Sequence, residues 1–359
     1  MADDAWRGDR ATRIADNGAM VMMMSLRSLS LVAAACALAA CGSAPVKTAV
    51  PASKPTVQAP LPKPKIGLAL GGGAAKGFAH IGVIKMLEAN GIQADVVAGT
   101  SAGSVVGALY ASGMTPYQLQ TQAFALDETK IRDVSLFSGG LVKGQKLQDY
   151  VNTLLKQKPM QSFNKPFGAV ATELSTGKRT VFVRGNAGQA VRASSSVPGV
   201  FEPVQIGKTR YVDGGVVSPV PVDAARDLGA DVVIAVDISS KAAGNKPGSM
   251  LGIVNQSITI MGQKLGEQEL ARADIVIRPR VGKIGSADFE QKNVAILEGE
   301  RATQAAMPQI KAKIAAWQRA RAAAIAKRTP PPAKPKCDPS LLDKLGRWIG
   351  RDSSCAATD

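Results

Sequence analysis

The sequence predicts an α/β fold, in which helices pack on a mostly parallel β-sheet. Two observations lead to this prediction. Short apolar stretches of strand length alternate along the chain with segments in which apolar residues recur every three or four positions, the spacing of a helix. In addition, the 359 residues include 36 glycines, which favours tight loops between strands and helices over a plain helical bundle.

The first predicted elements form two successive strand–loop–helix units. A buried strand is expected at Ile66–Leu70, directly before a glycine cluster. Helical apolar spacing follows over Phe78–Ala89, and Gly91 is expected to end that helix. The next strand and helix are expected at Val96–Ala98 and Ala102–Ala111. Strands that alternate with helices in this way are typical of a parallel sheet.

Six further strands are expected, at Phe167–Glu173, Thr180–Val183, Val204–Ile206, Thr209–Val212, Asp231–Val236 and Ile275–Ile277. The third and fourth of these flank Gly207-Lys208, so we expect them to pair as a hairpin. After the last strand, Lys292–Lys327 is rich in Ala, Gln, Lys and Arg. This composition predicts a long basic helix, and Pro308 is expected to interrupt it.

The composition limits the chemistry that the chain can perform. Apolar residues make up 45% of the chain, and 44 Lys+Arg against 28 Asp+Glu give a formal net charge of +16, as in a basic globular protein. His80 is the one histidine, which excludes any mechanism with two imidazoles and disfavours a multi-histidine zinc site. The four cysteines form no CxxC pair, so no metal is expected. Only 4% of residues are aromatic, which disfavours nucleic-acid binding.

Residues 1–41 are similar to a lipoprotein signal sequence. Several arginines precede an apolar run from Leu29 to Ala40, which is too short to span a bilayer permanently. The run ends in Ala-Ala-Cys-Gly, which resembles a bacterial lipobox, so lipidation is expected at Cys41. By the same resemblance, Gly42 favours the outer membrane, facing the periplasm. The alternative is an apolar stretch that ends in this motif by chance.

The rest of the chain divides by composition. Residues 42–64 form a proline-rich tether, 65–282 the main domain, 283–328 a basic helical appendage, and 329–359 a proline-rich linker and tail. In the tail, Cys337 and Cys355 either pair in an oxidising compartment or remain free thiols. Aspartates early in the chain are unusual before a signal sequence, so a translation start between Met20 and Met24 is an alternative.

The strongest local motif is Gly99-Thr100-Ser101-Ala102-Gly103, a G-x-S-x-G sequence between an expected strand and an expected helix. In this setting a serine is held on a strained turn with its hydroxyl exposed. Gly99 and Gly103 are needed there, because larger side chains would clash in so tight a turn. The start of the following helix favours negative charge near Ser101. Ser101 is therefore the candidate nucleophile.

A second motif, GGGAAKG at residues 71–77, also lies between a strand and a helix. Such a loop can direct several backbone N–H groups at one anion. The candidate donors are Gly72, Gly73, Ala74 and Ala75. The spacing fits neither the dinucleotide fingerprint nor the P-loop, which leaves the oxyanion of a tetrahedral intermediate as the alternative anion. Lys76 either adds positive charge there or pairs with a carboxylate elsewhere.

A serine nucleophile needs a base. His80 is one candidate, and the alternative is a packed histidine that holds the glycine loop to its helix. Two aspartates at strand ends, Asp213 and Asp237, are the carboxylate candidates. Gly214 and Gly215 permit a sharp turn that would present Asp213 to a cleft. The alternatives are that Asp213 is an ordinary turn aspartate and that Asp237 caps the segment after it.

Taken together, four sequence blocks resemble the patatin-like phospholipase family, in its bacterial branch related to neuropathy target esterase. The blocks are residues 71–82, 99–103, 192–203 and 213–215. The resemblance covers roughly residues 66–238, the motif core, and implies a three-layer α/β/α patatin-like sandwich. It also implies a Ser–Asp dyad of Ser101 and Asp213, a glycine-rich oxyanion hole, and no catalytic histidine, metal or organic cofactor.

The resemblance further implies a serine acyl-ester hydrolase that acts on phospholipid or lysophospholipid in a membrane. A lipid acyltransferase and a non-catalytic lipid-binding scaffold are the alternatives. Within the second motif, which Gly77 closes, Ala74 stands where many relatives have glycine and Lys76 where arginine is common. We expect the N–H at position 74 to remain usable, and the lysine to keep the charge without the bidentate fork. Residues Thr115–Phe163 and the helix after Met250 are expected to cover the cleft.

Overall fold

The computed structural model describes residues 61–127, 131, 133, 142–241 and 248–328. The predicted signal sequence, its Cys41 and most of the tether lie outside the described residues. The same holds for Cys337 and Cys355 in the tail. Among the helices that are described, none is both long and apolar enough to cross a membrane.

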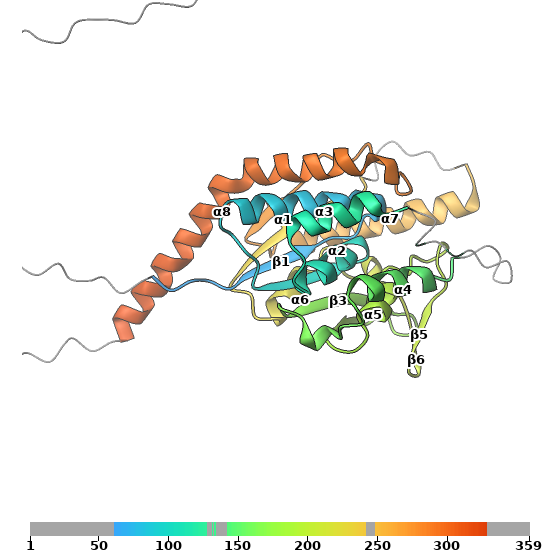
Figure 1. Ribbon diagram of the computed structural model, residues 1–359, viewed down its shortest axis with the longest axis horizontal. Helices are drawn as coiled ribbons and strands as arrows, with labels where there is room; N and C mark the ends of the chain where they lie inside the picture. Colours follow the sequence, from blue (N-terminus) through green and yellow to red (C-terminus); the bar gives the residue numbers. More distant parts are fainter. Residues whose placement is uncertain (1–60, 128–130, 132, 134–141, 242–247, 329–359) are drawn as a thin grey trace, which may run out of the picture. The chain divides into compact units, whose positions relative to one another are not determined.

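An eight-stranded sheet forms the centre of the fold, with the order β5-β6-β3-β2-β1-β7-β8 and with β4 paired to β3 (Figure 1). The strands are β1 Ile66–Leu70, β2 Val96–Thr100, β3 Phe167–Glu173, β4 Arg179–Phe182, β5 Val204–Ile206, β6 Thr209–Asp213, β7 Val232–Val236 and β8 Ile275–Ile277. The five strands from β3 to β8 along this order pair in parallel, whereas β4, β5 and β6 run antiparallel to their partners. The predicted mostly parallel sheet and the β5–β6 hairpin are confirmed.

The helices are α1 Ala79–Ala89, α2 Ala102–Ala111, α3 Pro116–Ala125, α4 Gln145–Leu154, α5 Ala187–Ser194, α6 Val222–Asp227, α7 Met250–Leu270 and α8 Lys292–Arg328. A short 3-10 helix, η1, spans Ala74–Phe78, so α1 begins one residue later than predicted. The predicted interruption before Pro308 is wrong, because α8 continues through this residue. Figure 1 shows α8 bent along its length, the usual effect of a proline that removes a hydrogen bond within a helix.

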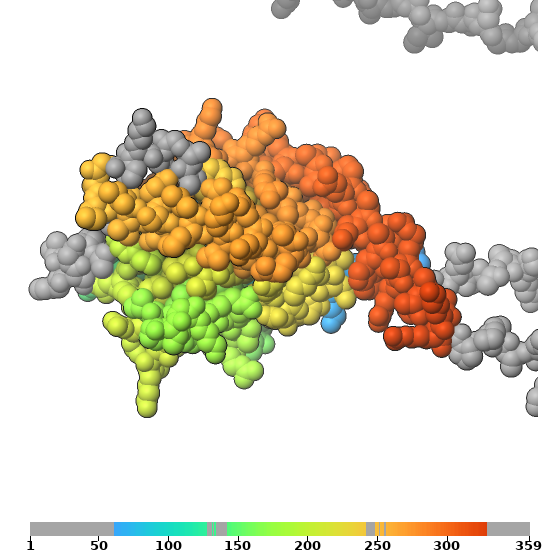
Figure 2. Space-filling view, turned by 180° about the vertical axis from the view of Figure 1, so that it is seen from behind, coloured from blue at the N-terminus to red at the C-terminus, as the bar shows by residue number. Residues whose placement is uncertain are grey.

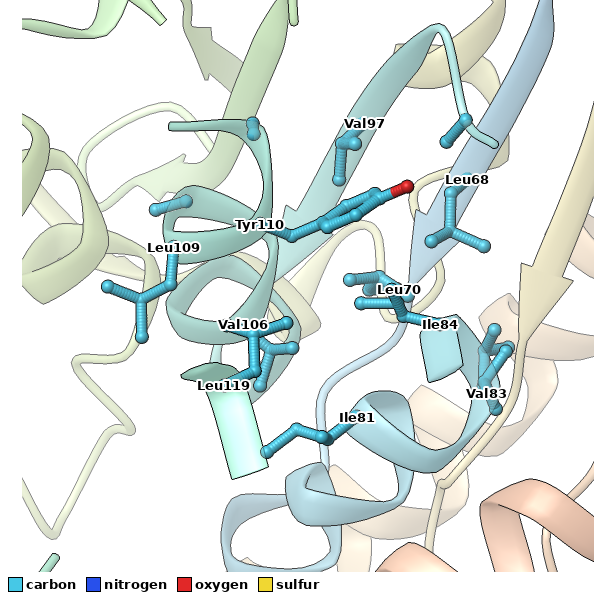
Figure 3. Close-up of a cluster of buried hydrophobic side chains, with 14 of the residues drawn as sticks. Leu68, Leu70, Ile81, Val83, Ile84, Val97, Val106, Leu109, Tyr110 and Leu119 are labelled. Carbon is cyan, nitrogen blue, oxygen red and sulfur yellow. The ribbon is translucent and has the colours of Figure 1, made fainter. Parts of the chain in front are cut away.

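Alternation along the strands sends side chains to opposite faces of the sheet. Leu68 and Leu70 of β1 and Val97 of β2 pack in one cluster with α1, α2 and α3 (Figure 3). The neighbouring Ala69 and Ala98 belong to a second cluster, which contains α6 and the end of α7. Helices therefore cover both faces of the sheet, as the predicted three-layer arrangement requires.

Two glycines allow α1 and α8 to approach each other closely. A Cβ atom on Gly82 would lie 1.9 Å from the carbonyl oxygen of Ile296, and one on Gly299 would lie 2.1 Å from that of Ala79. Neither position has room for a side chain. Residues 283–328, which were expected to form a basic appendage, thus include a helix whose first half is buried against α1.

Replacing either glycine with alanine is expected to destabilise the fold. Although alanine favours helix more than glycine, its Cβ would push the two backbones apart. We expect Gly82→Ala and Gly299→Ala each to lower the free energy of unfolding by about 3 kcal/mol. Gly282→Ala is the control, because no atom lies within 4 Å of a Cβ at that position. Urea unfolding measures all three, and equal midpoints for Gly82→Ala and Gly282→Ala would contradict the close packing.

Candidate active site

Ser101 occupies a strained turn between β2 and α2. Its φ of +52° and ψ of −124° lie in a region that residues with a side chain rarely adopt. The N–H of Ser101 donates to the Ser194 hydroxyl at 2.9 Å. Its carbonyl oxygen accepts from the N–H of Ser104 at 2.8 Å and from the Ser104 hydroxyl at 2.6 Å. Hydrogen bonds on both sides therefore hold the turn in its strained conformation.

The turn is packed so tightly that glycine is required on both sides of it. A Cβ on Gly99 would lie 2.4 Å from the carbonyl oxygen of Gly103, and a Cβ on Gly103 would lie 2.1 Å from that of Leu70. A Cβ on Gly77 would lie 2.7 Å from the Cβ of Ala102. The serine turn thus contacts both the end of β1 and the glycine loop directly.

Two of the four candidate donors in the glycine loop already have acceptors. The Gly72 N–H donates to the carbonyl oxygen of Pro219 at 3.0 Å. The Ala75 N–H donates to the carbonyl oxygen of Ser286 at 3.2 Å. These bonds hold the loop to two distant segments of the chain, and they leave neither N–H available to an oxyanion.

The other two donors, the N–H groups of Gly73 and Ala74, have no acceptor among the described residues. Ala74 is exposed and has a φ of +52°, a left-handed conformation that glycine adopts without strain. The loop faces the candidate nucleophile, because a Cβ on Gly72 would lie 3.3 Å from the Cβ of Ser101. Gly73 and Ala74 are therefore the donors that can meet a charge developing beside Ser101.

His80 is buried behind the glycine loop. Its Nε2 lies 2.8 Å from the carbonyl oxygen of Gly71, and its Nδ1 has no hydrogen-bond partner in the described part of the chain. Burial lowers the pKa of His80 to about 4, so the ring is neutral and Nε2 is the donor. No hydrogen bond between described residues links this ring to Ser101 or Asp213. The structure thus places His80 as a packed histidine that holds the loop.

Asp213 is buried at the end of β6 and is held by both its backbone and its side chain. Its N–H donates to the carbonyl oxygen of Ser196 at 2.8 Å, and its carbonyl oxygen accepts from the Thr172 hydroxyl at 2.8 Å. The carboxylate Oδ1 accepts from the N–H of Gly215 at 2.6 Å. Oδ2 is buried and has no hydrogen-bond partner among the described residues.

The structure brings Ser101 and Asp213 together. Burial raises the pKa of Asp213 to about 6, and the adjacent Ser101 hydroxyl and Gly215 N–H offset part of that rise. The Ser101 hydroxyl lies near enough to the carboxyl group to lower its pKa, while Oδ2 has no hydrogen-bond partner among the described residues. Such contacts commonly tighten when substrate binds. Near pH 7, Asp213 is thus mostly ionised, with one oxygen available to accept a proton.

The other charged candidates have different environments. Asp237 forms ion pairs with Arg278 at 3.4 Å and Lys241 at 3.8 Å, and acts as a structural carboxylate. Lys76 is buried and donates to the Ser240 hydroxyl, and burial lowers its pKa. It forms no ion pair with any described residue. In the same residues, no group of three or more His, Cys, Asp or Glu side chains is placed to bind a metal ion.

Sequence reasoning missed Glu269, a buried carboxylate near the end of α7. Its Oε1 accepts from the Ser218 hydroxyl, and its Oε2 accepts from the Val220 N–H at 2.8 Å. Burial raises the pKa of Glu269 to about 7, although both hydrogen bonds oppose the rise. A glutamate in a helix gives no sequence signal for this role, because its partners lie in a distant loop.

Glu269 acts on the candidate site through loop 218–220. The carbonyl oxygen of Ser218 accepts from the Thr100 hydroxyl at 2.8 Å, beside the serine turn. The carbonyl oxygen of Pro219 accepts from the Gly72 N–H at 3.0 Å, in the glycine loop. One carboxylate thus helps to position both halves of the site.

Comparison with known proteins agrees with the predicted resemblance. Residues 68–226 match the sequence profile of the family described as patatin-like phospholipase. An uncharacterized NTE family protein of Mycobacterium tuberculosis is 35% identical over 183 residues, which is 50% of this chain and 51% of the relative. Patatin-like phospholipase domain-containing protein 7 of Rattus norvegicus is 32% identical over 184 residues, which is 49% of this chain and 14% of the relative.

The chain therefore spans about half the length of the mycobacterial relative, at 51%. Among solved structures, VipD from Legionella pneumophila aligns with a TM-score of 0.49 and 15% identity, covering 70% of this chain and 67% of VipD. Both Ser101 and Asp213 lie inside the segment that matches the family profile.

Removing the Glu269 carboxylate is expected to loosen the glycine loop. Glu269→Ala leaves the Ser218 hydroxyl and the Val220 N–H buried without acceptors, so the free energy of unfolding should fall by about 2 kcal/mol. Hydrogen exchange at the Gly72 N–H should become faster, because Pro219 is no longer held. The control is Glu267→Ala, which removes an exposed carboxylate and should change neither quantity. Unchanged exchange at Gly72 in Glu269→Ala would contradict the positioning role.

Proposed function

We propose that this chain is a patatin-like lipid hydrolase that cleaves acyl esters, with Ser101 as nucleophile and Asp213 as its base. One observation carries the proposal. A buried aspartate with an unpartnered oxygen lies beside the hydroxyl of a serine on a strained strand–helix turn. The match of residues 68–226 to the patatin-like phospholipase family supports a lipid ester as the substrate class.

In the first half of the reaction, the Ser101 oxygen attacks the ester carbonyl while Asp213 accepts the hydroxyl proton. The negative charge then moves to the former carbonyl oxygen. The N–H groups of Gly73 and Ala74 are available to stabilise it, and the start of α2 adds favourable electrostatics. Collapse of the intermediate breaks the ester bond, and the proton on Asp213 passes to the departing alcohol.

In the second half, water replaces the alcohol. Asp213 accepts a proton from this water, whose oxygen attacks the acyl-enzyme, and the same two N–H groups stabilise the second intermediate. Collapse releases the fatty acid, and Asp213 returns its proton to Ser101. The raised pKa suits this exchange, because a carboxylate with a pKa of about 6 is a stronger base than an ordinary aspartate.

Phospholipids or lysophospholipids are the proposed substrates, and a lipid anchor on Cys41 is proposed to hold the protein at the outer membrane, facing the periplasm. The support for the anchor is the short apolar run that ends at Cys41. The proline-rich segment after it is suited to act as a tether between the anchor and the catalytic domain.

Removing either member of the dyad is expected to abolish turnover. Ser101→Ala lacks the nucleophilic oxygen, and Asp213→Asn lacks a base, so each should lower kcat by at least about a thousandfold on a chromogenic acyl ester. Asp237→Asn is the matched control, since this buried strand-end aspartate takes part in ion pairs instead. Circular dichroism verifies that each variant is folded. Substantial turnover by folded Ser101→Ala would show that another group attacks the ester.

The pH profile should report the ionisation of Asp213. Because burial raises its pKa to about 6, the carboxyl group is protonated and inactive as a base below that pH. We therefore expect kcat/KM for a soluble ester to rise with pH and to reach half its maximum near pH 6 (about the pKa of Asp213). A profile that stays flat across this range would mean that a different base operates.

A further inference from the structure

The first half of α7 leaves five apolar side chains exposed. No charged residue occurs between Met250 and Gln263. The exposed apolar side chains are Met250 at 78%, Ile253 at 50%, Val254 at 46%, Ile260 at 48% and Met261 at 57%. We call these five side chains the α7 strip. A helix on a protein surface normally turns charged or polar residues to water, so a strip of this kind indicates an interaction site.

The α7 strip adjoins the candidate active site. A Cβ on Gly262 would lie 4.0 Å from the carbonyl oxygen of Gly215, whose N–H binds Asp213. A Cβ on Gly266 would lie 3.9 Å from Pro219, in the loop that holds the glycine loop. Among the α7 residues whose burial is described, Gly266, Glu269 and Leu270 are buried, so most of the helix lies along the surface of the molecule (Figure 2). The α7 strip ends at Met261, directly before Gly262, which lies against the candidate site.

We propose that the α7 strip docks onto the surface of the lipid membrane that contains the substrate. This inference rests on the proposed lipid-ester hydrolysis and names the surface on which it takes place. The uncharged half of α7 is roughly 20 Å long at the rise of an α-helix, which is enough to lie in the interface between headgroups and acyl chains.

Cations at the same end of the molecule fit a membrane better than a second apolar protein surface. Lys208 and Arg210 lie on the β5–β6 hairpin, which leads into Asp213 and lies toward the same end of the molecule as the start of α7 (Figures 1 and 2). Lys264, which follows the uncharged half of α7, pairs with Glu267 at 3.3 Å. Neither Lys208 nor Arg210 forms an ion pair with a described residue. An apolar strip with unpaired cations at the same end of the molecule matches acyl chains below phosphate headgroups.

Docking through the α7 strip places the lipid ester beside the catalytic pair. After the α7 strip, the helix passes Gly215 at its own residue Gly262. It then reaches Glu269, which binds loop 218–220. A lipid therefore needs to leave the bilayer only partly for its ester to reach Ser101.

The first test compares two substrates in the full chain. We expect Ile253→Asp and Met261→Asp each to reduce hydrolysis of phosphatidylcholine–phosphatidylglycerol vesicles by about tenfold, because a charged side chain replaces one that inserts among acyl chains. Hydrolysis of a soluble short-chain ester should remain unchanged. The matched controls are Tyr117→Asp and Val183→Asp, which alter apolar side chains of 79% and 39% exposure away from α7. Wild-type vesicle rates in both strip variants would overturn the proposal.

A second measurement does not depend on turnover. An environment-sensitive fluorophore is attached at Ile253→Cys or, as a control, at Tyr117→Cys, in a chain with Ser101→Ala and with its native cysteines replaced by serine. On adding vesicles, we expect a blue shift at position 253 alone. If the wild type hydrolyses no ester, this shift still supports docking while the proposed function fails. The docking proposal would be overturned if no shift occurs at position 253. It would also be overturned if the only effect of the strip variants is to dissociate a dimer, because the strip would then be an interface between two copies of the chain.

Discussion

The serine turn and the end of β1 lie so close that no side chain fits between them. Gly103 lies at this contact, where a Cβ would lie 2.1 Å from the carbonyl oxygen of Leu70. Gly99 lies on the other side of the turn, where a Cβ would lie 2.4 Å from the carbonyl oxygen of Gly103. In this close contact Ser101 has a φ of +52°, and its side chain begins 3.3 Å from where a Cβ on Gly72 would lie, beside the glycine loop. The contact also brings the start of α2 beneath the serine, where the helix favours negative charge. One close backbone contact thus helps to place both the candidate nucleophile and the candidate oxyanion donors.

The second requirement is electrostatic. A buried aspartate and a serine at positive φ are both unfavourable for folding, and the surrounding hydrogen bonds keep them in place. Thr172 and Ser196 bind the backbone of Asp213, while Ser194 binds the N–H of Ser101. Burial that opposes the charge of Asp213 also makes it a better base. In the proposed mechanism, a carboxylate in this environment performs the proton transfer for which many serine hydrolases use histidine, and His80 holds the loop.

Local signals in the sequence predicted most of the strands and the residues that meet at the site, because glycine spacing and apolar runs report directly on turns and buried strands. The availability of each N–H donor could not be predicted in this way. It depends on acceptors such as Pro219 and Ser286, which reach the glycine loop only through the folded chain. The same is true of Glu269, whose role arises from its partners and not from its neighbours in the sequence. At Pro308, the packing of α8 against α1 outweighed the local tendency of proline to end a helix.

The roles proposed for Ser101, Asp213 and the glycine loop can be tested by the structure of the protein after reaction with a fluorophosphonate. We expect phosphorus bonded to the Ser101 oxygen and a phosphonyl oxygen within about 3 Å of the N–H groups of Gly73 and Ala74. We also expect a carboxylate oxygen of Asp213 within hydrogen-bond reach of the adduct. An adduct on a different residue, or a phosphonyl oxygen directed away from the glycine loop, would contradict the proposed roles.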